Sequence, residues 1–227
     1  LFEIAQLSQR SIVADLGAGT GILTRHFAGR VSQVYAVEPN PDMHRVATRE
    51  LAGRSTVQVI DGAAEATTLP ADSINLITVA QAIHWFNPDP TMAEMARILK
   101  PDGWLAILRN IATNSQRDAA LEQIVNEELG AGHTAIYPKL LKKPVEHYFG
   151  SGTYQKLTFA FQLRQQWPAF IGVLSTVSYM PPTTDPRFAR VERRAREYFD
   201  HQSQDGELLV EGETEMLIGQ PVWIKER

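Results

Sequence analysis

Short apolar runs and amphipathic segments follow one another along the first half of the chain. Residues 11–14 and 33–37 are largely apolar and rich in β-branched side chains, which is typical of strands buried on both faces of a parallel sheet. Residues 43–51 repeat apolar side chains at helical spacing, and Asp42 is expected to cap this helix. The first half therefore predicts buried strands connected by helices.

Two longer strands with one polar face each are expected later in the chain. Residues 154–164 and 208–218 alternate apolar and polar side chains. Between them lie an apolar segment, a Pro-Pro pair and a helix over residues 188–199, a long insertion of the kind that usually covers an active site. Residues 133–149, after a helix expected over residues 117–129, are interpreted as a loop over the site.

The helix over residues 188–199 has an arginine-rich face opposite an apolar stripe. The arginines are Arg187, Arg190, Arg193, Arg194 and Arg196. A solvated helix face accounts for them, and the alternative is a surface for an acidic partner or substrate.

A glycine-rich turn follows the first apolar run and is expected to open a helix. Residues 14–22 read Ala-Asp-Leu-Gly-Ala-Gly-Thr-Gly-Ile, and glycines allow a ligand to approach the backbone closely. A dinucleotide fingerprint needs its third glycine where Ile22 stands, but here that glycine comes one place early, at Gly21. Asp15 at the strand end would repel a pyrophosphate and attract an ammonium group. The turn therefore predicts a nucleoside cofactor with a positive group.

An acidic residue ends the second apolar run. Glu38 lies about 20 residues after the first glycine of the turn, the offset at which a carboxylate accepts hydrogen bonds from ribose hydroxyls. A carboxylate there repels a ribose phosphate, which disfavours a phosphorylated nicotinamide cofactor. Met43, in the helix that follows, either reaches the adenine face or packs in the helix–sheet core.

With these features the chain resembles the class I S-adenosylmethionine-dependent methyltransferases, specifically type 11 and the trans-aconitate methyltransferase-like subgroup. The resemblance covers residues 12–108 and continues through Gly62-Ala-Ala-Glu, Gln81-Ala-Ile-His-Trp-Phe and Ile98-Leu-Lys-Pro-Asp-Gly. It implies an α/β fold with a doubly wound, seven-stranded Rossmann-like sheet in the order 3-2-1-4-5-7-6. The last strand would be antiparallel, with a helical lid insertion between the last two strands.

The resemblance also implies a division of the chain. Residues 1–110 would form the cofactor-binding core. Residues 111–227 would complete that core with the last two strands and add lid segments at about 131–150 and 166–203.

Carried over position by position, the resemblance implies an S-adenosylmethionine site. Asp15 and the Gly17 backbone would lie by the methionine amino group, Glu38 would hold the ribose, and Ala63 would edge the adenine. The cofactor-binding positions are Asp15, Gly17, Ala18, Gly19, Gly21, Glu38, Pro39, Met43, Ala63, Ala64, Ala80 and Gln81.

Two positions depart from the family pattern. Many members carry an acid where this chain has Ala63, so only backbone can bond the adenine amino group, which costs about 1 kcal/mol. Asp102 replaces the first glycine of the usual Lys-Pro-Gly-Gly turn.

The acceptor side carries weaker signals. Methyl transfer needs in-line alignment and exclusion of water more than it needs a catalytic triad. His84 is the candidate base or substrate orienter, against the alternative that the His-Trp-Phe loop only packs under a helix. Trp85, Arg109 and Tyr179 are substrate candidates, and Arg109 could hold a carboxylate or form a surface salt bridge.

Composition limits the classes of partner. The net charge of −4 and pI of about 5.9 argue against a nucleic-acid surface. Without cysteine the chain has neither disulfides nor thiolate metal sites, and no metal is expected. No apolar stretch suits a membrane span and no signal peptide is visible, so a cytoplasmic location is expected.

The sequence thus predicts transfer of a methyl group from S-adenosylmethionine to a small molecule, such as the carboxylate or hydroxyl of an organic acid, leaving S-adenosylhomocysteine. The first alternative is a catalytically silent protein that binds either compound as a sensor or regulator. The second is a nicotinamide-dependent oxidoreductase, which Ile22 and the lack of a Tyr-x-x-x-Lys pair in the sheet region disfavour. The sequence is silent on oligomeric state.

Overall fold

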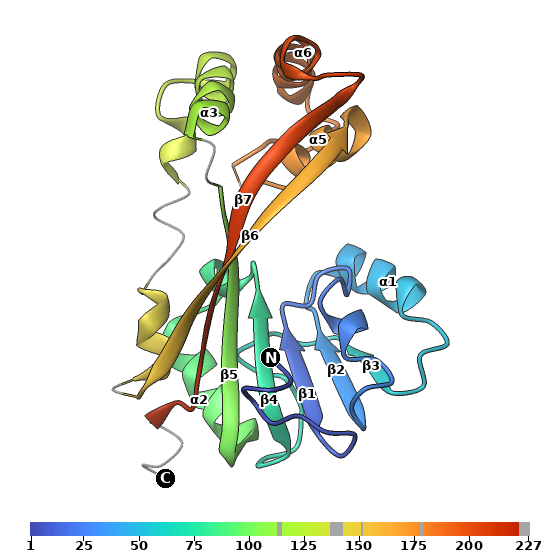
Figure 1. Cartoon of the computed structure of the whole chain (residues 1–227), viewed down its shortest axis with the longest axis vertical. Helices are drawn as coiled ribbons and strands as arrows, with labels where there is room; N and C mark the ends of the chain where they lie inside the picture. Colours follow the sequence, from blue (N-terminus) through green and yellow to red (C-terminus); the bar gives the residue numbers. More distant parts are fainter. Residues whose placement is uncertain (113–114, 137–142, 151, 178, 223–227) are drawn as a thin grey trace. The chain divides into compact units, whose positions relative to one another are not determined.

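Seven strands form one sheet in the order β3-β2-β1-β4-β5-β7-β6 (Figure 1). The computed structural model describes residues 1–112, 115–136, 143–150, 152–177 and 179–222. The strands are β1 (Ile12–Leu16), β2 (Gln33–Val37), β3 (Val57–Ile60), β4 (Ile74–Ala80), β5 (Leu99–Ala112), β6 (Tyr154–Gln166) and β7 (Glu207–Gly219). The predicted strand order is confirmed.

Strands β1 to β5 run parallel to one another, and β7 runs antiparallel to them. The parallel register pairs Val13 with Val34 on one side and with Leu76 on the other. Along β6 and β7 the order reverses: Gly219 lies against Tyr154, whereas Gly212 lies against Phe161. Residue numbers therefore rise along β6 as they fall along β7, so the two strands run in opposite directions, which confirms the antiparallel last strand.

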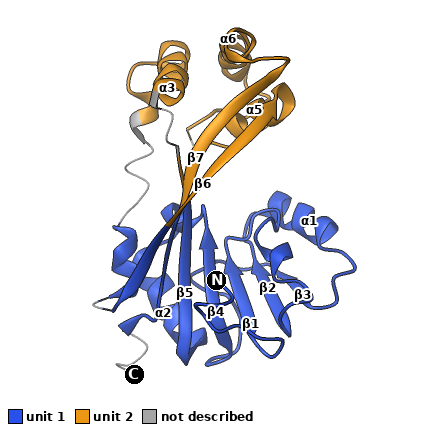
Figure 2. Ribbon diagram, viewed as in Figure 1, with its two compact units in different colours: residues 1–109, 141–157, 215–227 blue, residues 110–140, 158–214 orange. Residues whose placement is uncertain are grey.

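The chain divides into two compact units (Figure 2). Unit 1 consists of residues 1–109, 141–157 and 215–227, and unit 2 of residues 110–140 and 158–214. The strands β5, β6 and β7 contribute residues to both units. Among the described residues, no helix is long and apolar enough to cross a bilayer.

The core of unit 1 lies on both faces of the sheet. Alternate residues of a strand point to opposite faces, so Leu105 and Ile107 pack on one face and Ala106 on the other. The first face is covered by α2 (Pro88–Ile98), whose Met95 and Ile98 are fully buried. At the edge formed by β2 and β3, α1 (Pro41–Glu50) packs Ala47 against the sheet.

Three local predictions are wrong. The glycine turn is followed by further turns and the short 3-10 helix η1 (Thr24–His26), where an α-helix was expected. The Thr24 side chain is bound to Asp15, and Gly29 has a positive φ, which an α-helix does not contain. The cap of α1 is Asn40, whose side chain accepts from the backbone N–H groups of Asp42 and Met43, so Asp42 lies inside the first turn.

The third correction concerns the Lys-Pro-Asp-Gly segment. It lies within β5 as an irregularity and not as a turn before the strand. Leu99 pairs with Ile74 and Trp104 with Leu76, so extra residues are accommodated on the β5 side.

Part of the first expected lid segment belongs to the core of unit 1. The 3-10 helix η4 (Val145–Phe149) buries Val145, Tyr148 and Phe149 in the same apolar cluster as Ile83 and Phe86. Residues 137–142 of that segment lie outside the described residues. The buried side chains make η4 a packing element of unit 1.

Unit 2 contains the helices α3 (Ser115–Leu129), α5 (Trp167–Ser175) and α6 (Pro186–Gln202), and the 3-10 helix η3 (His133–Ile136). The predicted helical insertion between the last two strands is confirmed, because α5 and α6 lie between β6 and β7 in the chain. Phe170, Val191 and Phe199 lie in the core of unit 2. On α6, Arg187 pairs with Asp185, Arg194 with Glu127 and Arg196 with Asp200.

Candidate functional site

The carboxylate of Asp15 is buried at the carboxyl end of β1. The Thr24 hydroxyl donates to Asp15 Oδ2 at 2.6 Å and the Thr78 hydroxyl donates to Oδ1 at 2.9 Å. Asp15 is 1% exposed, and this burial raises its pKa to about 6 although both hydroxyls lower it. Asp15 therefore holds Thr24 beneath the glycine turn, and the ammonium contact expected for it stays a prediction.

The glycine turn, which follows β1, is hydrogen-bonded to the end of β2. The backbone N–H groups of Gly17 and Ala18 both donate to the Val37 carbonyl oxygen, at 2.9 and 3.1 Å. Gly17 has φ of 67°, and a Cβ atom there would lie 2.5 Å from Ala82 Cβ, so only glycine fits. Gly19 also has a positive φ, but a Cβ there would meet nothing within 4 Å. The backbone at Gly19 is therefore open to a ligand.

Glu38 connects the end of β2 to the glycine turn. Its Oε2 accepts from the Gly19 N–H at 2.8 Å, and its Oε1 accepts from the Asn40 N–H at 2.9 Å. Each carboxylate oxygen has a further lone pair, so Glu38 can accept ribose hydroxyls while it holds the turn. The next residue, Pro39, is exposed, and Met43 in the first turn of α1 is 38% exposed, which leaves its side chain accessible to a ligand.

The chain turns sharply after β3, at the positions expected to edge the adenine. The Ala66 N–H donates to the Ala63 carbonyl oxygen at 3.0 Å, and Ala64 is buried beside this turn. The Glu38 N–H donates to the Ile60 carbonyl oxygen at 3.0 Å, so the ends of β2 and β3 are adjacent. This adjacency brings the turn after β3 to the same edge of the sheet as Glu38.

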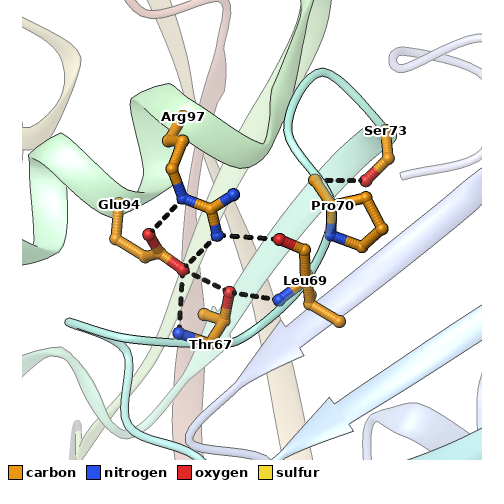
Figure 3. A network of polar contacts seen from close by, with 6 residues as sticks. All are labelled: Thr67, Leu69, Pro70, Ser73, Glu94 and Arg97. Atoms are coloured by element: carbon orange, nitrogen blue, oxygen red, sulfur yellow. Dashed lines mark hydrogen bonds and ion pairs between the residues drawn. The ribbon is translucent and has the colours of Figure 1, made fainter.

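A polar network fastens the segment after this turn to α2 (Figure 3). Glu94 Oε1 accepts from the Thr67 N–H at 2.8 Å and also from the Thr67 hydroxyl. Arg97 donates to both oxygens of Glu94 and to the Leu69 carbonyl oxygen at 2.7 Å. The hydrogen bonds from Arg97 are the main reason that the pKa of Glu94 falls to about 2.

The loop after β4 carries the acceptor candidates. The Gln81 N–H donates to the Leu108 carbonyl oxygen at 3.0 Å, which places Gln81 beside β5. In the 3-10 helix η2 (Ile83–Trp85), His84 is half-buried and burial lowers its pKa, which favours the neutral imidazole that can accept a proton. Trp85 is 59% exposed, with its ring centroid 5.1 Å from that of His84.

Arg109 lies one residue beyond Leu108 on β5 and pairs with the buried carboxylate of Glu215. Lys156 pairs with the same carboxylate. The salt bridge that the sequence offered as one alternative for Arg109 is therefore present, and it is partly buried. Its Nε, however, has no hydrogen-bond partner among the described residues.

Tyr179 belongs to unit 2, unlike the other candidates, which all lie in unit 1. Its backbone carbonyl oxygen lies 2.6 Å from His133 Nε2. In unit 1 the structure brings together the glycine turn, Glu38 and the end of β3 through hydrogen bonds.

Some functional partners were missed by sequence reasoning. Thr24 and Thr78, which bind Asp15, carry no local signal because they lie nine and 63 residues away from it. Glu94, which accepts hydrogen bonds from Thr67, was also missed. An Asn-Pro pair before an amphipathic helix could have identified Asn40 as the cap.

Comparisons with known proteins agree with this arrangement. Residues 14–107 match the family model of a methyltransferase domain. An uncharacterised methyltransferase of Mycobacterium tuberculosis is 42% identical over 98 residues, which are 43% of this chain and 39% of that protein. A ubiquinone/menaquinone biosynthesis C-methyltransferase of Hydrogenovibrio crunogenus is 32% identical over 47% of this chain and 44% of its own length. The chain thus matches less than half the length of each of these relatives.

Solved structures share the fold over nearly the whole chain. A candidate methyltransferase of an antibiotic biosynthesis pathway from Anabaena variabilis has a TM-score of 0.62 at 19% identity, over 95% of this chain and 93% of that one. The YcgJ protein from Bacillus subtilis has a TM-score of 0.58 at 20% identity, over 96% and 94% of the two chains. Residues 14–107 therefore resemble a methyltransferase domain, and nearly the whole chain shares the fold of these two solved structures.

Proposed function

We propose that this chain transfers a methyl group from S-adenosylmethionine to a small-molecule acceptor. One observation carries the proposal: Glu38 bonds the Gly19 N–H at the open point of the glycine turn. A ribose-binding carboxylate and an accessible backbone are thus held together at the carboxyl edge of the sheet, where ligands bind in such folds.

The residues present fit this cofactor. Glu38 would accept the ribose hydroxyls, Met43 would cover the adenine, and the backbone of Ala63 and Ala64 would edge it. Gly17, Ala18, Gly19 and Gly21 form the turn, and Ala80 and Gln81 would lie below the methionine arm. When bound, the cofactor supplies an activated methyl group with a good leaving group.

The acceptor side rests on fewer contacts. His84 would orient a hydroxyl or take its proton, because burial lowers its pKa and so favours the neutral imidazole. Arg109 and Trp85 would contact the acceptor, with Tyr179 as a further candidate from unit 2. A carboxylate acceptor needs no base, whereas a hydroxyl gains from His84. We propose action in the cytoplasm, and the net charge of −4 favours a small-molecule partner over nucleic acid.

Cofactor binding tests the proposal. Isothermal titration calorimetry with S-adenosylhomocysteine should give saturable binding, and Glu38→Gln should weaken it about 10-fold, because hydrogen bonds to charged groups contribute about 1.5–3 kcal/mol. The melting temperature should rise with S-adenosylhomocysteine and stay unchanged with NADH. Absence of binding at millimolar ligand would overturn the proposal. Binding without methyl transfer in a broad metabolite screen would support the silent sensor instead.

A further inference from the structure

Two carboxylates connect the segment after β3 to α2, one at the cap residue of the helix and the other in its middle. Glu94 bonds Thr67 in the way described above. Closer to the turn, Glu65 Oε1 accepts from the backbone N–H of Asn87 at 2.7 Å. The first contact anchors the segment to the body of the helix, and the second reaches the residue that directly follows the His84-Trp85-Phe86 loop.

Asn87 occupies the cap position of α2 without using its own side chain. Its backbone is extended, and its side chain makes no capping hydrogen bond. Asparagine is among the preferred cap residues, and the start of a helix attracts negative charge. Glu65, 22 residues away in the chain, places a carboxylate at this helix start. The contact thus connects Glu65 to the residue between α2 and the loop of residues 83–86, which we call the acceptor loop.

Glu65 is half-buried and lies close enough to η4 for its charge to act on Tyr148. After burial, the negative charges of Glu65 and Asp89 are the causes that raise the pKa of Tyr148 to about 12. Tyr148 is itself buried in the cluster that contains Ile83 and Phe86. Glu65 therefore lies near Tyr148, which packs in the same cluster as Ile83 and Phe86, and it also bonds Asn87 at the end of the acceptor loop.

We propose that Glu65 is a positioning residue that couples the cofactor side of the site to the acceptor loop. Glu65 follows Ala63 and Ala64 directly, and the Ala63 to Ala66 turn holds it in place. A nucleoside bound against Ala63 and Ala64 restrains this turn, and the Glu65 to Asn87 hydrogen bond passes the restraint to residues 83–87. Ordering by one ligand lowers the cost of ordering for the next. The inference rests on the proposed function.

The test uses Glu65→Ala, Glu65→Gln and the exposed control Glu3→Ala in the full chain. Without ligand, hydrogen exchange at Asn87 should be about 10-fold faster in Glu65→Ala, the effect of losing a charge-assisted bond, and close to wild type in Glu65→Gln, whose amide oxygen still accepts. Circular dichroism and melting temperature establish that each variant is folded.

The coupling is measured at Trp85, by titrating S-adenosylhomocysteine and subtracting the fluorescence of Trp85→Phe protein. Wild type, Glu65→Gln and Glu3→Ala should show a ligand-dependent change, and Glu65→Ala should lose most of it while binding about 5-fold more weakly. The inference is overturned if Glu65→Ala keeps the full change in Trp85 fluorescence, or if wild type binds S-adenosylhomocysteine without any such change. Either result leaves the proposed function standing. No calorimetric binding by wild type removes the proposed function and this inference together.

Discussion

At the scale of single residues, Asp15 stands out because a carboxylate is buried where two threonine hydroxyls only partly replace its water. Burial raises its pKa from 3.8 to about 6. A raised pKa means that the folded protein holds the proton more tightly than the unfolded chain does. The stabilisation from the protonated group is complete below pH 4 and is lost as the pH rises through 6.

Asp15→Asn removes this titration. Between pH 4 and pH 7 the unfolding free energy of wild type should fall by up to about 3 kcal/mol relative to that of Asp15→Asn. The fall arises because the pKa of Asp15 is about 6 in the folded protein, above the ordinary value of 3.8. Urea unfolding at the two pH values measures the difference. The exposed control Asp61→Asn should follow wild type, and parallel pH profiles for wild type and Asp15→Asn would contradict the assignment.

Residue types in the glycine turn were readable from sequence, whereas the state of Asp15 was not. Glycine at positions of positive φ follows from local backbone sterics, which a short motif encodes. The partners of Asp15 come from η1 and β4, and only folding brings them together. Met43 shows the same limit: its helical spacing suggested either core or ligand contact, and its exposure appeared only in the structure.

At the scale of elements, α2 organises the segment between β3 and β4. Glu94 on α2 accepts from the Thr67 N–H and hydroxyl and pairs with Arg97 (Figure 3). These bonds lower the pKa of Glu94 from 4.5 to about 2. A lowered pKa means that Glu94 contributes stability above pH 4.5 and that this contribution disappears as the pH falls through 2.

Glu94→Gln should therefore destabilise the protein by about 2 kcal/mol at pH 7. The hydrogen bonds that Thr67 and Arg97 donate would lose their charged acceptor, and the new amide N–H groups would face these donors. The loss should shrink as the pH approaches 2. Chemical unfolding monitored by circular dichroism measures it, with Glu50→Gln on the exposed end of α1 as the control. Equal stability of Glu94→Gln and wild type at pH 7 would refute the role given to this network.

Element identity was largely predictable, and element boundaries were less so. The parallel strands were recognised because burial on both faces demands continuous apolar runs. The helix expected after the glycine turn is replaced by turns and η1, since the side chain of Thr24 is bound to Asp15 and the backbone at Gly29 has a positive φ. The cap of α1 moved from Asp42 to Asn40 because the hydrogen-bond geometry, and not the residue type alone, selects the cap.

At the scale of the whole molecule, the last strand completes a core that the first half of the chain begins. Leu217 on β7 is fully buried in the cluster that contains Leu16, Ile77 and Leu105. Leu209 lies on the same strand in unit 2 and is 43% exposed. Two leucines of one strand thus differ in burial.

Leu217→Ala should cost about 3 kcal/mol, because a buried leucine loses transfer free energy and leaves a cavity. Leu209→Ala, the matched control, should cost less than about 1 kcal/mol. Denaturant midpoints of the two variants give the comparison. Similar losses in both would show that β7 does not close the core of unit 1 in solution.

The sequence by itself indicated the buried strands and the glycine turn, because glycine placement, acidic residues at strand ends and apolar runs are local consequences of backbone sterics and burial. The strand order came from the resemblance to methyltransferases that these motifs carry, and the structure confirms it. Tertiary structure alone decided which side chains meet: Asp15 with Thr24 and Thr78, Arg109 with Glu215, and Glu65 with Asn87. Such contacts join residues far apart in the chain, and their free energy depends on burial and hydrogen-bond geometry, which exist only after the strands have paired.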